Sequence, residues 1–211
     1  MITPKQSSEF IIKNISGTKV IPVIVLDDVS IAADLARTLV DAGMPVLEVT
    51  LRTPNALQVI EAMAKVDGAI IAAGTVLNEK HISQCKAAGA QLLVSPGHTD
   101  TLIQRAGIED MPLLPGAVTA SEIMRLSDAG FHLVKFFPAA ISGGVNALKA
   151  FFSLLPHIQF CPTGGISEQN MNDYLSLPNV PVVGGSWVVT QQDLQEKNWK
   201  NISAKAQAMA V

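Results

Sequence analysis

Apolar, β-prone runs alternate with segments of helical period along almost the whole of this 211-residue chain. The β-prone runs lie at 20–25, 46–51, 69–75, 91–95, 112–115, 132–137, 158–163 and 180–185. Helices are expected near 30–42, 54–65, 79–88, 99–106, 119–129, 144–153, 168–175 and 191–208, and a further amphipathic helix near 8–15 precedes the first strand. This alternation is typical of α/β proteins, in which helices connect parallel strands.

Eight such units, each about 26 residues long, fit a small (β/α)₈ TIM barrel with an extra N-terminal helix. A doubly wound open sheet is the competing fold, because it uses the same alternation. Short connections and the lack of a GxGxxG motif after the first strand favour the barrel. No linker or low-complexity tract divides residues 1–211, so we expect a single domain. Ser30, Thr53 and Asn78 are expected to cap three of the helices.

Composition narrows the choice of partners. Hydrophobic residues make up 48% of the chain and charged residues 16%, which is more apolar than a solitary domain needs and predicts contacts between subunits. The net charge of −3 and the absence of a basic run argue against nucleic acid. No apolar run reaches the roughly 20 residues of a membrane span, and no signal sequence is recognisable at the start. Cys85 and Cys161 lack metal or disulfide spacing, so we expect a cytoplasmic protein.

Two charged residues interrupt apolar strands, where a charge has no structural use. Lys135 lies in the run 132–138 and Glu48 in the run 46–52. A buried ammonium ion costs several kcal/mol unless it is paired or loses its proton, and a neutral lysine can attack a carbonyl to form a Schiff base. A structural ion pair is the alternative. Alternation places Glu48 and Lys135 on the inner faces of their strands, so one shared site is predicted, with Glu48 transferring protons.

Further polar groups are expected at the carboxyl ends of the strands, where barrel active sites lie. Arg52 offers a planar fork for a carboxylate, although it could be an ordinary surface arginine. Thr75 and Thr163 could supply hydroxyl groups there, or could serve as turn or cap residues.

Glycines follow the last two strands. The pair Gly164 and Gly165 and the run 184–186, which ends in Ser186, lie in the two loops that bind phosphate in many barrels, although tight turns would also use them. The four histidines are isolated from one another, so no metal site is predicted.

Six ordered strings resemble the bacterial class I enzyme family of 2-keto-3-deoxy-6-phosphogluconate aldolase, which also acts on 4-hydroxy-2-oxoglutarate. They are Val-Leu-Glu-Val-Thr-Leu-Arg at 46–52, Ala-Gly-Thr-Val-Leu-Asn at 73–78, Ser-Pro-Gly at 95–97, Val-Lys-Phe-Phe-Pro-Ala at 134–139, Phe-Cys-Pro-Thr-Gly-Gly-Ile at 160–166 and Gly-Gly-Ser-Trp at 184–187. The run at 140–142 and the chain beyond about 190 depart from the family pattern, so the motifs indicate the mechanism and leave the choice of substrate open.

The resemblance implies a role for each motif residue. The Schiff-base lysine falls on Lys135 and the proton-transferring glutamate on Glu48. Contacts to the pyruvate part of the substrate fall on Arg52, Thr75, Thr163, Phe137 and Pro96, and contacts to its phosphate on Gly164, Gly165, Gly185 and Ser186.

The resemblance further implies a homotrimeric barrel that cleaves a phosphorylated 2-keto acid in the Entner–Doudoroff pathway and needs no cofactor. A 2-keto-3-deoxy-6-phosphogalactonate aldolase remains an alternative. So do a sugar-phosphate isomerase or epimerase and a sugar-phosphate sensor without catalysis.

Overall fold

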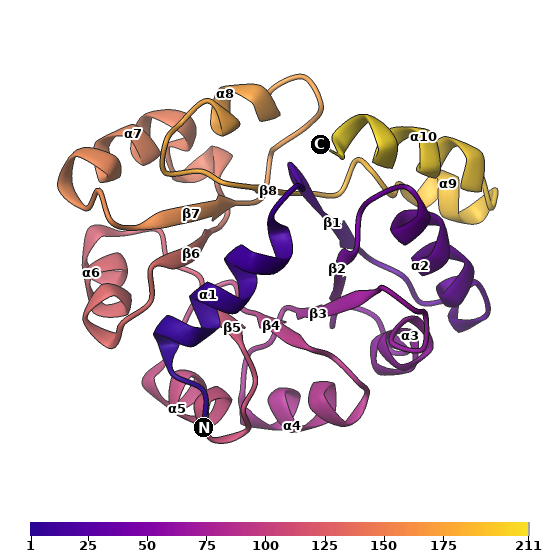
Figure 1. The fold of residues 1–211 in the computed structure, drawn as a ribbon, viewed down its shortest axis with the longest axis horizontal. Coiled ribbons are helices and arrows are strands. Elements are labelled where there is room, and N and C mark those ends of the chain that lie inside the picture. The colour runs from indigo at the N-terminus through magenta and orange to yellow at the C-terminus, as the bar shows by residue number, and fades with distance from the viewer. Residues whose placement is uncertain (211) are drawn as a thin grey trace.

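Within residues 1–210, eight short parallel strands curve around one axis, with helices outside them (Figure 1). The computed structural model describes residues 1–210. One sheet has the order β5-β4-β3-β2-β1-β8, and β6 pairs with β7. Parallel bridges between Gly116 and Lys135, and between Thr163 and Gly184, join the two sheets into a closed barrel. The strands are β1 Val20–Ile24, β2 Val46–Thr50, β3 Ile70–Gly74, β4 Leu92–Val94, β5 Leu113–Leu114, β6 Leu133–Phe136, β7 Gln159–Pro162 and β8 Val183–Gly185.

The helices follow the predicted order, and the (β/α)₈ barrel with an extra N-terminal helix is confirmed. The α-helices are α1 Pro4–Ile15, α2 Ala32–Asp41, α3 Ala56–Met63, α4 Glu79–Ala87, α5 Asp100–Ile108, α6 Ala120–Ala129, α7 Gly144–Leu154, α8 Met171–Leu175, α9 Gln191–Gln195 and α10 Trp199–Met209. Two 3₁₀ turns, η1 Val29–Ile31 and η2 Ala140–Ser142, precede α2 and α7. Among residues 1–210, no helix has both the length and the apolar character needed to cross a membrane.

Both ends of the chain differ from the prediction for local reasons. Helix α1 begins at Pro4 because Thr3 and Gln6 form a reciprocal capping box. The single helix predicted at 191–208 is two helices, because Lys197 adopts a left-handed conformation (φ 51°) and Asn198 caps α10.

Of the three predicted N-caps, only Asn78 is confirmed, as it accepts from the amide of His81. The predictions for Ser30 and Thr53 are wrong. Asp28 caps the turn in which Ser30 lies, and the Thr53 hydroxyl donates instead to the carbonyl of Leu26 at 2.8 Å.

The strands separate two apolar cores, as period-2 alternation predicts. On β2, Val46 faces the lumen of the barrel, whereas Leu47 and Val49 pack beneath the helices. Glu48 shares the lumen face with Val46, and Lys135 shares it with Leu133 on β6. The barrel interior therefore receives both of the out-of-place charges.

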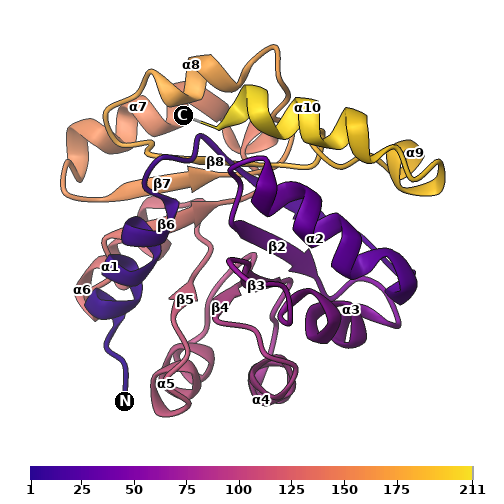
Figure 2. The ribbon, with the colours of Figure 1, turned by 45° about the vertical axis from the view of Figure 1, so that its right-hand side comes forward.

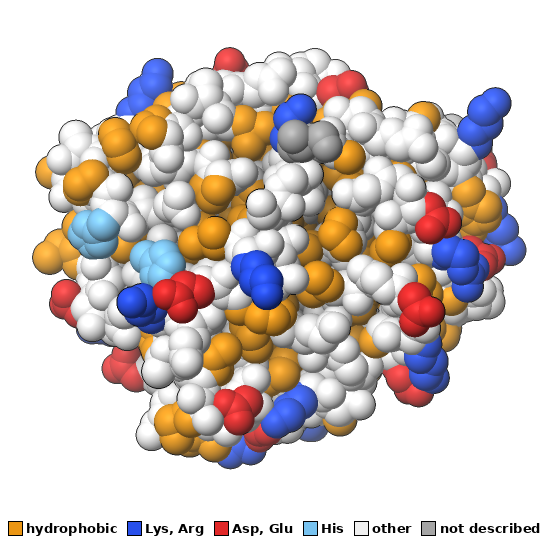
Figure 3. Space-filling view, viewed as in Figure 1, with side chains coloured by type: hydrophobic (Ala, Val, Ile, Leu, Met, Phe, Trp, Pro, Cys, Tyr) orange, Lys and Arg blue, Asp and Glu red, His pale blue; other side chains and the backbone are white. Residues whose placement is uncertain are grey.

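Helix α1 lies across the amino-terminal end of the barrel (Figure 2). Ile11 and Ile15 pack into the inner cluster, and the Ser8 hydroxyl accepts from the amides of His132 and Leu133 at the start of β6. Polar and charged side chains lie among apolar ones on this face (Figure 3). Helix α1 thus covers the amino-terminal end, while the cavity over the interior charges lies toward the carboxyl end of the strands.

Candidate active site

Lys135 and Glu48 form a buried ion pair inside the barrel. The Lys135 Nζ lies 2.8 Å from Oε1 and 3.1 Å from Oε2 of Glu48. The residues are 5% and 4% exposed, respectively. The prediction that these two charges meet in the lumen is confirmed, and the amine has a carboxylate within direct proton-transfer distance.

The backbone of Lys135 is held at the point where β5 and β6 close the barrel. Its amide donates to the carbonyl of Pro115, and its carbonyl accepts from the amide of Ala117, both at 2.9 Å. Above the amine, the Phe137 ring centroid lies 5.7 Å from Nζ. The side chain therefore extends from a fixed strand toward an apolar wall, which orients the amine.

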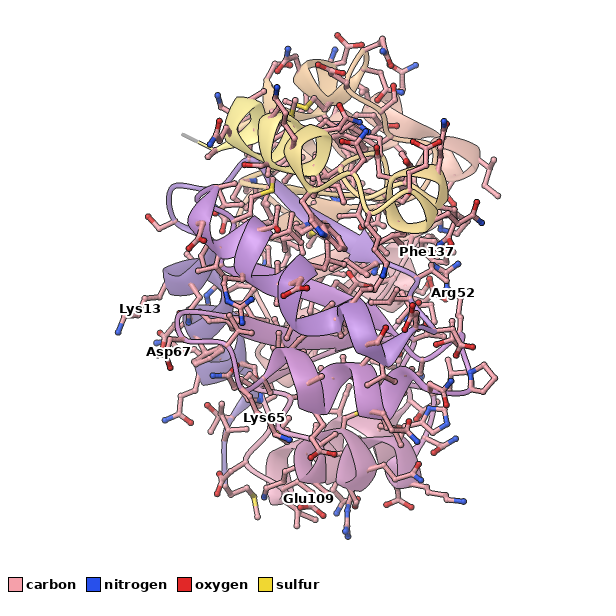
Figure 4. The ribbon with its side chains drawn as sticks, turned by 90° about the vertical axis from the view of Figure 1, so that its right-hand side faces the viewer. Lys13, Arg52, Lys65, Asp67, Glu109 and Phe137 are labelled. Carbon is pink, nitrogen blue, oxygen red and sulfur yellow. The ribbon has the colours of Figure 1, made fainter. Side chains whose placement is uncertain are left out.

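A cavity of about 250 Å³ opens over this pair. It is lined by Val23, Glu48, Thr50, Arg52, Thr75, Pro96, Lys135, Phe137 and Thr163. Every residue predicted to contact the pyruvate part of a substrate is in this set. Val23 and Thr50 were not predicted, although the alternation that turns Glu48 inward also turns Thr50 inward. Figure 4 shows Arg52 and Phe137 at the end opposite Lys13 of α1.

Arg52 lies at the rim of the cavity, and its guanidinium is placed to bind an anionic ligand. Its Nε donates to the Thr50 hydroxyl at 3.3 Å, and that hydroxyl in turn donates to the carbonyl of Ile24 at 3.2 Å. The guanidinium makes no ion pair within residues 1–210. An arginine steadied in this way can bind an incoming carboxylate through its remaining donors.

Two threonines complete the wall of the cavity. The Thr163 hydroxyl is buried and has no hydrogen-bond partner among the described residues, although buried polar groups normally have one. Thr75 adopts a left-handed conformation (φ 63°), which is costly for a β-branched residue and is most often found at functional sites. The unpaired hydroxyl of Thr163 favours a ligand-binding role, and Thr75 combines a bend after β3 with a place in the cavity wall.

A second compartment, of about 170 Å³, adjoins the first. Val23, Arg52, Phe137 and Thr163 line both compartments. The rest of the second wall is Gly164, Gly165, Ile166, Gly184, Gly185 and Ser186. The predicted phosphate residues of both loops are thus brought together.

Glycine is required in the first of these loops. Gly164 and Gly165 have φ of 97° and 74°, conformations that other residues rarely adopt. Successive residues of this kind can turn backbone amides toward an anion.

Among the described residues, neither the nearby thiol of Cys161 nor a metal-binding cluster offers an alternative to the Lys135 amine. Burial raises the pKa of Cys161 to about 12, an effect that the nearby Lys135 charge only partly offsets. Cys161 therefore stays a thiol at neutral pH and is a poor nucleophile. Within residues 1–210, no group of three or more histidine, cysteine, aspartate or glutamate side chains is arranged to hold a metal ion. The amine of Lys135, by contrast, has the Glu48 carboxylate beside it as a proton acceptor.

Several known proteins are similar to this chain along most of its length. A 2-dehydro-3-deoxy-phosphogluconate aldolase of Pseudoalteromonas atlantica is 48% identical over 193 residues, which cover 90% of each chain. A KDPG aldolase structure from Legionella pneumophila, described as holding pyruvate as a covalent carbinolamine intermediate, has a TM-score of 0.91 at 39% identity and covers 100% of this chain and 99% of that one.

A 2-keto-3-deoxy-6-phosphogluconate aldolase structure from Zymomonas mobilis with 3-phosphoglycerate has a TM-score of 0.91 at 41% identity, and the match covers 97% of this chain and 96% of that one. The family model described as KDPG and KHG aldolase matches residues 11–205. The resemblance found in the six strings is confirmed, and the chain belongs to the KDPG and KHG aldolase family.

Proposed function

We propose that this chain cleaves 2-keto-3-deoxy-6-phosphogluconate to pyruvate and D-glyceraldehyde 3-phosphate through a lysine Schiff base. It also cleaves 4-hydroxy-2-oxoglutarate to pyruvate and glyoxylate. The observation that carries the proposal is the buried contact of 2.8 Å between the Lys135 amine and the Glu48 carboxylate, at the base of a cavity that leads to a glycine-lined compartment.

The first half of the reaction forms the imine. Glu48 takes a proton from the Lys135 ammonium, and the neutral amine attacks the C2 ketone carbon to give a carbinolamine. Glu48 then returns a proton to the C2 hydroxyl, which leaves as water. The resulting protonated imine withdraws electrons from C3, so no metal ion or organic cofactor is needed for the next step.

The second half breaks the carbon–carbon bond. Glu48 takes the proton of the C4 hydroxyl, directly or through a water molecule, and the electrons of the C3–C4 bond move into the imine to give an enamine. The aldehyde product departs. Protonation of the enamine at C3 and hydrolysis of the imine release pyruvate and restore Lys135.

The two compartments divide recognition of the substrate. Arg52, Thr75 and Thr163 bind the C1 carboxylate, while Phe137 and Pro96 form the apolar walls around the three-carbon unit. The second compartment receives the phosphate through the backbone of Gly164, Gly165 and Gly185 and the hydroxyl of Ser186. The two compartments adjoin at Arg52. With the carboxylate bound in the first and the phosphate in the second, the reacting carbons are held between two bound anions.

Pyruvate release from the two C4-epimeric phosphorylated substrates tests the assignment. Fast release from the gluconate-series substrate is expected. A preference for the galactonate-series substrate would instead assign the chain as a 2-keto-3-deoxy-6-phosphogalactonate aldolase. Interconversion of a sugar phosphate without pyruvate release would indicate an isomerase, and binding without turnover would indicate a sensor.

We propose that the chain assembles as a homotrimer and that it is located in the cytoplasm. The apolar composition of the chain, 48% hydrophobic and 16% charged, supports the assembly. Two buried, free cysteines suit a reducing compartment. Light scattering should give three times the chain mass of 22.3 kDa, and a monomer would contradict the trimer.

A further inference from the structure

The side chains on the inner face of β3 become smaller toward the active site. Ile70, Ala72 and Gly74 point into the lumen, since they pair in register with Val46, Glu48 and Thr50 on the inward face of β2. Ala72 lies directly beside Glu48, and Gly74 lies one pair closer to the carboxyl end. This strand therefore leaves space at the level of the carboxylate.

Glu48 fills that space. A Cβ atom added to Gly74 would lie 2.5 Å from Oε1, 2.9 Å from Cγ and 3.1 Å from Cδ of Glu48. Carbon atoms in contact are normally about 3.5–4.0 Å apart, so the side chain and the added carbon exclude each other. Gly74 does not have a left-handed φ, so the backbone conformation there would accept another residue. Space for Glu48 accounts for the glycine.

Glu48 has little freedom to yield. It is 4% exposed, and both of its oxygens contact the Lys135 amine. The amide of Leu51 donates to the carbonyl of Gly74 at 2.8 Å, which ties β2 to β3 at this level. A larger residue at position 74 would therefore move the carboxylate away from the amine.

We propose that Gly74 is a positioning residue for the aldolase reaction: its missing side chain creates the recess that seats the Glu48 carboxylate against Lys135. This inference rests on the proposed function for its kinetic consequences. It has a separate consequence for stability, because the steric conflict exists whether or not the chain turns over a substrate.

Gly74→Ala should slow catalysis while leaving substrate binding nearly intact. A displacement of about 1 Å in a catalytic group can cost on the order of 10²-fold, so we expect kcat to fall at least about tenfold. The KM for the phosphorylated substrate should change less than about threefold, because β3 contributes nothing to the glycine-lined compartment. The rate at which pyruvate and borohydride inactivate the enzyme should fall together with kcat.

A double-mutant cycle with Glu48→Ala provides the test. Glu48→Ala removes the atoms that the new methyl group would strike. Gly74→Ala should therefore lower the urea midpoint of the wild-type protein but leave the midpoint of Glu48→Ala unchanged. If the unpaired lysine prevents Glu48→Ala from folding, the same comparison is made in the Lys135→Met, Glu48→Ala background.

Gly97→Ala is the matched control, since an added Cβ there meets nothing within 4 Å and its φ is not left-handed. This control should keep wild-type kcat and midpoint. Three results would each overturn the inference. They are an equal midpoint loss from Gly74→Ala with and without Glu48, an unchanged kcat in Gly74→Ala, and an equal loss in Gly97→Ala.

If the wild-type protein cleaves neither substrate, the proposed function fails. The midpoint cycle still decides whether Gly74 seats Glu48.

Discussion

Replacing Glu48 by glutamine should destabilise the protein in a way that depends on pH. The substitution keeps the shape of the side chain but removes the charge that lies 2.8 Å and 3.1 Å from the Lys135 amine. Both side chains are almost completely buried, so the lysine can regain only a small part of the hydration shell that it has in water. Removing one partner of a buried pair costs about 3–5 kcal/mol.

The lysine can avoid this cost by losing its proton. The free energy of deprotonation is therefore an upper limit on the stability that the variant loses. A lysine in water has a pKa of about 10.4, so deprotonation costs about 4.6 kcal/mol at pH 7 and about 1.9 kcal/mol at pH 9. In the variant the unfolded chain binds one more proton than the folded chain, so stability rises with pH. The difference from wild type should therefore shrink by up to about 2.7 kcal/mol between these two values, the full amount applying if the lysine is already neutral at pH 7.

Urea unfolding at pH 7 and pH 9, at one fixed protein concentration, measures this difference. The double variant Glu48→Gln, Lys135→Met is the control, because it removes both charges and should lose no more stability at pH 7 than at pH 9. A loss below about 1 kcal/mol at pH 7, or a loss equal at both pH values, would refute the view that the pair is a dry ion pair.

Three other changes separate substrate contacts from structural ones. Ser186→Ala should lower kcat/KM about tenfold or more for the phosphorylated substrate, and little for 4-hydroxy-2-oxoglutarate, because one hydrogen bond to a charged group is worth roughly 1.5–3 kcal/mol; equal losses would make Ser186 structural. Arg52→Lys should reduce kcat/KM on both substrates by a similar factor of about ten, since both carry the C1 carboxylate; a loss on one substrate alone would contradict this role. Burial alone would raise the pKa of Asp193, but hydrogen bonds from Lys205, Thr190 and Asn201 and the Lys205 charge lower it to about 2. This carboxylate therefore contributes about 2 kcal/mol above pH 4 that is lost as the pH falls toward 2, and the stability gap between wild type and Asp193→Asn, followed by urea unfolding, should close over that range.

The strand positions and the central charges were predictable from the sequence because they depend on local patterns. Alternation assigns Glu48 to one face of β2 and Lys135 to one face of β6, and a charge on such a face is conspicuous against Val, Leu and Phe. The same pattern contained Thr50, which lines the cavity although it was not predicted.

Contacts between distant strands could not be predicted in this way. The recess at Gly74 depends on the register between β2 and β3, and the break at Lys197 depends on one backbone angle. Threonine is a common N-cap residue, but the hydroxyl of Thr53 donates to a carbonyl in the neighbouring β1–α2 loop. Tertiary partners decide such cases, and a periodicity does not reveal them.

The most direct test of the proposed chemistry is to trap the imine. Incubation with pyruvate and borohydride should abolish activity and add one reduced pyruvyl group to the peptide that contains Lys135, as read by mass spectrometry. Lys135→Arg should gain no such group, since a guanidinium that stays protonated cannot attack a carbonyl. A modification on another lysine, or full activity after treatment with no modification, would contradict the central claim that Lys135 forms the covalent intermediate.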